Sequence, residues 1–189
     1  MSRPFAPERR AEILDQVIEY LAQYGLSNLS IRKLAAALGT STTVITYQFG
    51  SRNDLVSAAL GRAREANLTF LDTYRATHSG ISTGAGLIVL WDWWGADPTN
   101  LAFSRIDMEA MMIDGRVPAD VREDLLLFWL RYFTAWLEAD GHSNATAEIR
   151  ASLTLATLSG LTIDLLSTGD ASRTRSALEA FAAMIDERP

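Results

Sequence analysis

The chain has 189 residues, of which 48% are hydrophobic and 21% charged, and its formal net charge at pH 7 is −6. This length suits one large domain or two small ones, and the hydrophobic share is sufficient for a buried core. The absence of cysteine excludes disulfides, thiolate metal sites and cysteine nucleophiles, and His78 and His142 are the only histidines.

Charge is distributed unevenly along the chain. Residues 1–64 hold eight basic and five acidic side chains, a balance of +3, whereas residues 65–189 have a balance of −9. This asymmetry favours a basic amino-terminal part that faces phosphate groups and an acidic remainder. Chance is the alternative, because the counts are small.

Helical periodicity dominates the sequence, and no long segment alternates apolar and polar residues, so we predict an all-α fold. The first helix is expected over residues 8–24, with Gly25 as its stop. Ser30 can cap a short second helix over residues 31–38. The apolar face of the first helix contains Ile13, Leu14, Val17, Leu21 and Tyr24.

The segment after residue 38 predicts a tight turn and another short helix, over residues 42–49. Gly39 suits the positive φ of such a turn, and Thr40 or Ser41 can cap the helix that follows. One side of this helix is apolar, with Val44, Ile45 and Phe49. The uncharged side consists of Ser41, Thr42, Thr43, Thr46, Tyr47 and Gln48. Such a surface suits the DNA major groove, and a solvated face on a linker helix is the alternative.

The stretch "LSIRKLAAALGTSTTVITYQFGSRNDLV", residues 29–56, resembles the helix-turn-helix signature of TetR/AcrR-type transcriptional regulators. The resemblance is strong over about residues 8–62. It implies that the third helix meets DNA and that Arg52 contacts a phosphate. Many relatives have a tyrosine at the position of Thr46, so whether Thr46 or Tyr47 reads bases stays open.

Two helix starts in this segment are also suited to the DNA backbone. Ser51 and Asp54 form a predicted cap three residues apart, and Ser30 with Arg32 opens the second helix. The predicted DNA-binding residues are therefore Ser30, Arg32, Ser41, Thr42, Thr43, Thr46, Tyr47 and Arg52.

A long helix is expected over residues 51–77, followed by a loop over residues 77–86. This helix joins the amino-terminal head to the rest of the chain without a flexible linker. We predict a helix-turn-helix DNA-binding domain over residues 1–55 and a helical effector-binding and dimerisation domain over residues 56–189.

Large aromatic residues and methionines are concentrated in the carboxy-terminal part, where a helix is predicted over residues 119–139. Such residues fill an ordinary core, and they also line apolar cavities in helical bundles. The family resemblance implies an effector pocket here. The candidates are Trp91, Trp94, Phe103, Met108, Met112, Phe128, Trp129 and Tyr132, with Asp92, Arg105, Asp107 and Asp164 as candidate polar anchors.

The last two predicted helices, over residues 145–168 and 172–186, mix apolar residues with small ones that permit close helix contact. The resemblance implies that they form a dimer interface with a second copy. The candidate interface residues are Leu153, Ala156, Gly160, Ile163, Leu178 and Phe181. The alternative is that both helices complete a monomer.

The expected function is that of a ligand-responsive transcriptional regulator. It is a repressor that binds a palindromic double-stranded DNA operator as a homodimer and is released by a small, largely apolar effector. We expect a cytoplasmic protein without a membrane span, because Gly160 and Asp164 interrupt the most apolar carboxy-terminal stretch and the amino terminus lacks a signal-peptide core.

No catalytic constellation, metal site or cofactor is predicted, because the two histidines have no nucleophile, paired carboxylate or metal-binding companions. The alternative function is a ligand-binding or protein-interaction module with a degenerate DNA-binding head. The effector, the operator sequence, the regulated genes and the choice between repressor and activator cannot be read from the sequence.

Overall fold

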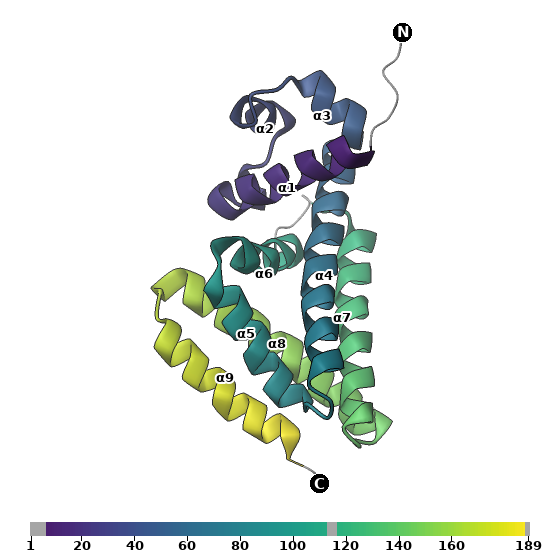
Figure 1. Ribbon diagram of the computed structural model, residues 1–189, viewed down its shortest axis with the longest axis vertical. Coiled ribbons are helices and arrows are strands. Elements are labelled where there is room, and N and C mark those ends of the chain that lie inside the picture. Colours follow the sequence, from purple (N-terminus) through teal and green to yellow (C-terminus); the bar gives the residue numbers. More distant parts are fainter. Residues whose placement is uncertain (1–6, 113–116, 188–189) are drawn as a thin grey trace. The chain divides into compact units, whose positions relative to one another are not determined.

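The computed structural model describes residues 7–112 and 117–187, and every regular element in these ranges is a helix (Figure 1). The elements are α1 (Pro7–Tyr24), the 3-10 helix η1 (Leu26–Asn28), α2 (Ile31–Ala37), α3 (Thr42–Phe49), α4 (Arg52–Thr77), α5 (Thr83–Ala96), α6 (Pro98–Met112), α7 (Ala119–Ala139), α8 (Asn144–Thr168) and α9 (Ala171–Asp186). The all-α prediction is confirmed, and the bounds of the predicted helices agree with those observed to within one residue.

The helices belong to two compact units. The first unit comprises Met1–Asn67 and Asp97–Arg122, and the second comprises Leu68–Ala96 and Glu123–Pro189. The division falls within α4 and within α7, so each of these helices contributes to both units.

The core of the first unit is built from α1 to α4 and α6. Ile13, Val17 and Leu21 of α1 are buried, as the periodicity predicted. Helix α1 packs against α6 in this unit. Tyr24 departs from the predicted apolar face, because 45% of it is exposed. It lies in the last turn of α1, and the chain is buried again directly after it, at Gly25 and Leu26.

A pair of charged side chains on α6 holds the end of α1. Arg105 donates to the carbonyl oxygen of Ala22 at 3.0 Å and pairs with Glu109 at 2.7 Å, and Glu109 accepts the backbone N–H of Leu26. Gly25 between them has φ 72°, and a Cβ there would lie 2.7 Å from the Arg105 guanidinium. The position therefore requires glycine for both its backbone angle and the space.

In the second unit, the start of α5 is bound by two carboxylates, that of Asp140 directly after α7 and that of Asp186 at the end of α9. Asp140 accepts the Thr83 backbone N–H and hydroxyl, both at 2.7 Å, and Asp186 accepts the Gly84 N–H at 2.8 Å. These bonds satisfy backbone donors that a helix start otherwise leaves open. The predicted loop over residues 77–86 is consequently too long, because α5 begins at Thr83.

Helix α8 is continuous over Asn144–Thr168, in agreement with the helix predicted over residues 145–168. By length and composition alone it resembles a membrane-crossing helix, and only 22% of its most apolar window is buried. Asp164 forms a bidentate ion pair with Arg173 of α9, in which Nη1 and Nη2 of Arg173 donate to the two carboxylate oxygens at 2.6 and 2.7 Å. The Arg173 hydrogen bonds lower the pKa of the Asp164 carboxyl. This charged pair ties the end of α8 to α9.

Candidate DNA-binding surface

The second helix of the head begins at a side-chain cap. Ser30 has an extended backbone, and its Oγ accepts the N–H of Lys33 at 3.2 Å, as the sequence predicted. Leu34 and Ala35 are buried, whereas Arg32 and Lys33 are exposed in the first turn. The start of α2 therefore presents two basic side chains to solvent, which suits a DNA phosphate.

The turn between α2 and α3 follows the predicted chemistry. Gly39 has φ 61°, and Ser41 is the residue that caps α3, since its Oγ accepts the Val44 N–H at 3.3 Å. The backbone N–H of Thr40 returns to the carbonyl of Ala35 at 2.9 Å and so closes the end of α2. The turn thereby fixes the direction in which α3 leaves α2.

Helix α3 separates an apolar side from a polar one. Ile45 and Phe49 are buried, and Val44 is half-buried. The predicted contact residues Thr42, Thr43, Thr46 and Tyr47 are exposed and share the opposite side of the helix. No residue of α3 is charged. The side that faces solvent thus offers hydroxyls, methyl groups and one phenol ring.

Thr46 and Tyr47 differ in what they can offer to a base. The Thr46 hydroxyl lies 3.0 Å from the carbonyl oxygen of Thr42 and 3.2 Å from that of Thr43. The hydroxyl therefore donates its proton to the backbone of α3 itself. Its methyl group and oxygen lone pairs remain for contact. Tyr47 is 52% exposed and is the longest side chain on this side of α3.

The carboxyl end of α3 is held by α1. Arg10 donates from Nε to the carbonyl oxygen of Gln48 at 3.2 Å, and its guanidinium lies 4.9 Å from the centre of the Phe49 ring. No role was predicted for Arg10. Its basic character alone gave no sign that it contacts a helix end 38 residues away.

A reciprocal cap begins α4. Asp54 accepts the Ser51 N–H at 2.9 Å and the Ser51 hydroxyl at 2.7 Å, and Ser51 Oγ accepts the Asp54 N–H at 3.2 Å. These hydrogen bonds from Ser51 lower the pKa of the Asp54 carboxyl. The predicted cap is therefore present.

Arg52 has a structural contact in addition to its predicted role at a phosphate. Its Nε donates to the carbonyl oxygen of Leu29 at 3.1 Å, and the side chain is half-buried. Arg52 thus holds the residue that precedes the Ser30 cap close to the start of α4. Lys33, which the sequence analysis omitted, is exposed beside Arg32, and this neighbouring position on α2 could have identified it.

The predicted effector-binding residues are divided between the two units. Trp91, Trp94 and Trp129 are buried in the second unit, where Phe128 and Tyr132 are half-buried. Phe103 and Met108 are buried in the first unit, and the side chain of Met112 lies outside the described residues. Two of the candidate polar anchors for an effector form ion pairs, Asp92 with Arg175 and Asp164 with Arg173. Arg105 donates to the end of α1, and Asp107 is buried in the first unit.

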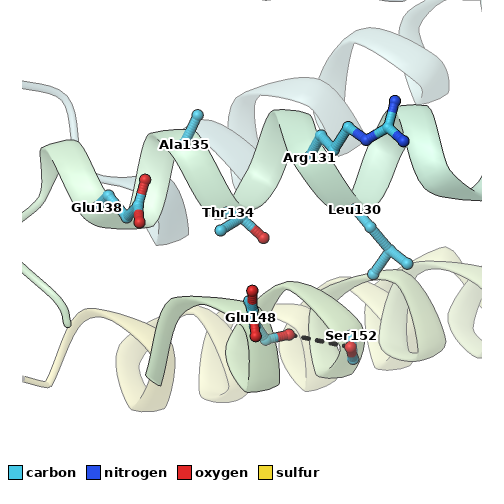
Figure 2. Close-up of a pocket in the computed structure, with 7 residues that line it drawn as sticks. All are labelled: Leu130, Arg131, Thr134, Ala135, Glu138, Glu148 and Ser152. Atoms are coloured by element: carbon cyan, nitrogen blue, oxygen red, sulfur yellow. Dashed lines mark hydrogen bonds between the residues drawn. The ribbon is translucent and has the colours of Figure 1, made fainter. Parts of the chain in front are cut away.

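A groove of about 370 Å³ lies between α7 and α8 in the second unit (Figure 2). Figure 2 shows Thr134 and Glu138 of α7 on one side and Glu148 and Ser152 of α8 on the other. The Ser152 hydroxyl donates to the backbone carbonyl of Glu148 at 3.0 Å. The predicted effector-binding residues do not line this groove.

The predicted interface residues occupy different environments in α8 and α9. Leu153 is 52% and Ile163 39% exposed, and Ala156 and Gly160 are exposed on the same side of α8. Ile149, 63% exposed, extends this stripe, and Met184 of α9 is 64% exposed. Phe181 is half-buried, whereas Leu178 is fully buried within its own subunit.

Residues 13–59 match the family model described as bacterial regulatory proteins, tetR family. The match extends from α1 into the first part of α4 and includes all the predicted DNA-binding residues. A comparison with curated protein sequences found no match.

Solved structures of transcriptional regulators have the same fold over nearly the whole chain. A TetR family member from Streptomyces coelicolor A3 is 26% identical, with a TM-score of 0.67 and coverage of 93% of this chain and 98% of that chain. A putative TetR-family regulator from Rhodococcus sp. is 19% identical, with a TM-score of 0.74 and coverage of 96% and 100%. A putative transcriptional regulator from Saccharomonospora viridis in complex with choline is 20% identical, with a TM-score of 0.71 and coverage of 94% and 97%. The last two likenesses show the fold alone.

Proposed function

Because the chain carries the amino-terminal domain of the bacterial tetR family and has the fold of TetR-family transcriptional regulators, we propose that it is a ligand-responsive repressor. In this proposal a homodimer binds a palindromic operator, and a small, largely apolar effector releases it. Residues 1–55 serve as the DNA-binding domain, and residues 56–189 bind the effector and form the dimer.

The observation that carries the proposal is the uncharged, exposed side of α3. Thr42, Thr43 and Tyr47 can contact base edges and thymine methyl groups without repulsion from phosphates. Arg32 and Lys33 at the start of α2 supply phosphate contacts, which fix the register on the duplex but select no sequence.

Dimerisation is supported by the exposed apolar stripe on α8. Ile149, Leu153 and Ile163 are large apolar residues that solvent reaches in the single chain. A Cβ added at Gly160 would have no atom within 4 Å, so the surface there is open and a second helix can approach it closely. Burial against the same stripe of a second copy would give a two-fold dimer with two α3 helices for two half-sites.

The effector is proposed to bind among the aromatic residues of the second unit. Trp129 and Tyr132 of α7 and Phe70 of α4 belong to that unit, and Phe70 stacks on Trp93 with ring centres 4.6 Å apart. Aromatic walls with few polar groups are typical of sites for apolar ligands. The fold neighbour from Saccharomonospora viridis is in complex with choline, which supports a small organic effector.

Release requires that the effector bind one conformation more tightly than the other. A difference of about 1–3 kcal/mol is typical of such coupling and changes operator affinity about 5- to 150-fold. By reciprocity, operator DNA must weaken effector binding by the same factor.

Selection from a randomised duplex pool by purified protein, at fixed near-physiological salt, tests the DNA-binding part of the proposal. We expect enrichment of a palindrome whose half-sites are separated by about one helical turn. A reporter placed behind the enriched site then distinguishes a repressor, which lowers expression, from an activator.

The second candidate function is a ligand-binding or interaction module with a degenerate head. The hydroxyl hydrogen of Thr46 is used within α3, which reduces the donors available for bases and favours this alternative. A pool from which no sequence is enriched, with effector absent or present, would contradict the repressor and support the module.

A further inference from the structure

A second groove, of about 440 Å³, lies in the first unit between α1 and the end of α2. Its volume is in the range of small-molecule sites. It is lined by Gln16, Glu19, Tyr20, Gln23 and Tyr24 of α1 and by Ala37 and Leu38 at the end of α2. None of these residues belongs to the predicted DNA-binding set, so operator binding does not account for the groove.

The electrostatic character of the groove is opposite to that of the sequence around it. Glu19 is the only charged residue of the lining, and it is exposed, whereas residues 1–64 as a whole have a balance of +3. The last turn of α2 has no basic residue, and its carbonyls at Ala35 and Ala36 accept the backbone N–H groups of Thr40 and Gly39. Arg105 compensates the end of α1, because it donates to the Ala22 carbonyl.

Two tyrosine rings form the aromatic part of the lining. The ring centres of Tyr20 and Tyr24 are 4.8 Å apart, with an angle of 41° between the ring planes. Tyr24 is 45% exposed, so part of its ring is accessible to a ligand in the groove, whereas Tyr20 is 8% exposed. The face of an exposed tyrosine attracts a cation, and a nearby carboxylate strengthens that preference.

We propose that this groove binds a small organic cation, with its ammonium or guanidinium group between the Glu19 carboxylate and the Tyr24 ring. Gln16 and Gln23 supply amide oxygens that can accept hydrogen bonds from the cation. An anion is disfavoured because the lining has no basic side chain. A divalent metal ion is disfavoured because one carboxylate is too few for the oxygen ligands it requires.

The site is independent of the effector pocket proposed for the second unit. Ala37 and Leu38 directly precede Gly39, so a bound cation connects α1 with the residues that lead into the turn before α3. The proposed site therefore lies beside the helix-turn-helix and within the first unit.

The test uses the full-length protein with carbon-13-labelled tyrosine rings, titrated with tetramethylammonium or methylguanidinium and observed by NMR. Signals of Tyr20 and Tyr24 are assigned from Tyr→Phe variants. We expect a saturable shift of the Tyr24 signal, and tert-butyl alcohol, a neutral molecule of similar shape, should not reproduce it. Because the readout is a ring in the groove, cation binding in the second unit does not interfere.

The variants Glu19→Gln and Tyr24→Leu should each weaken cation binding about fivefold, which corresponds to about 1 kcal/mol for the loss of one exposed contact. In Tyr24→Leu the Tyr20 signal serves as the reporter. Glu8→Gln removes the same charge from an exposed position of α1 outside the groove and should leave the affinity unchanged. Absence of a saturable shift, or equal weakening by Glu8→Gln and Glu19→Gln, would overturn the proposal.

Discussion

Tyr132 of the second unit combines a polar contact with packing against aromatic rings. Its hydroxyl donates to Asp72 at 3.1 Å, and its ring packs edge-on against Trp129 and Trp136. Burial, followed by the nearby negative charge of Asp72, raises the pKa of Tyr132 to about 12. The neutral phenol is therefore favoured in the folded protein.

We predict that Tyr132 stabilises the fold below its unfolded pKa of 10 and that this contribution is lost as the pH rises toward 12. The contribution is about 1 kcal/mol, because solvent screens a half-buried group. Tyr132→Phe should therefore flatten the alkaline fall in the free energy of unfolding, measured by denaturant titration at several pH values. Tyr74→Phe is the control, and an unchanged slope in Tyr132→Phe would refute the assignment.

The side chains of α3 give a second prediction at this scale. Thr43→Ala with Tyr47→Ala should weaken binding to the selected operator by about thirtyfold per half-site, from about 1 kcal/mol for each lost base contact. Dimerisation and thermal stability should not change, because both side chains are exposed. Thr69→Ala with Thr73→Ala, at exposed positions of α4, is the control in the same fluorescence-anisotropy assay. Dissociation of the dimer in the α3 variant would contradict the assignment.

Residue roles that depend on local sequence could be predicted, and those that depend on distant contacts could not. The caps by Ser30, Ser41 and Ser51 involve partners three residues away, so their spacing in the sequence is sufficient. Arg52 and Arg10 contact carbonyl groups 23 and 38 residues away, and nothing in the neighbouring residues indicates these partners.

Helix α5 packs on its neighbours through glycines. A Cβ at Gly86 would lie 2.1 Å from the Trp136 ring, and one at Gly84 would lie 2.4 Å from the carbonyl oxygen of Ala182 in α9. Helices α7, which carries Trp136, and α9 can approach α5 closely only because Gly86 and Gly84 lack side chains. Gly95 of the same helix has no atom within 4 Å of a Cβ position.

Gly86→Ala should destabilise the protein by about 1–3 kcal/mol, because the Trp136 ring must move in a packed core. Gly95→Ala should be neutral or stabilising by up to about 1 kcal/mol, because alanine favours a helix over glycine. Thermal or chemical unfolding of both variants measures the difference. Equal effects at the two positions would contradict the packing described for α5.

At the level of elements, helix bounds followed from periodicity and caps, but the start of α5 did not. Its first backbone donors bind Asp140 and Asp186, which are 57 and 102 residues away from their partners. Leu178 likewise fits the apolar pattern of α9, yet periodicity cannot distinguish a side that faces its own subunit from one that faces a partner.

For the whole molecule, the α8 stripe predicts the oligomeric state. Leu153→Glu should convert the dimer to a monomer, because burial of a charge at a subunit interface is unfavourable. Leu126→Glu changes an apolar residue of α7 that is 42% exposed and should leave the dimer intact. Sedimentation velocity distinguishes the two results. A dimer that persists in Leu153→Glu would show that α8 does not form the interface.

The sequence could not assign the predicted effector-binding residues to one unit, because aromatic content does not reveal which unit a residue joins. Phe103 and Met108 of α6 belong to the first unit, together with α1 to α3, and Trp91 and Trp129 belong to the second. Buried positions extend around most of α6 and include Ser104 and Asp107, so its pattern does not indicate which neighbour it packs against. Its place in the first unit depends on tertiary contacts with α1.

The division into two units also determines what fluorescence can report. All five tryptophans, Trp91, Trp93, Trp94, Trp129 and Trp136, lie in the second unit, and the first unit has tyrosines only. Tryptophan emission is therefore a probe of the second unit alone, whereas circular dichroism records the helices of both. If the DNA-binding helices melt first, the two signals will give different midpoints, and the difference will measure how far the units unfold independently.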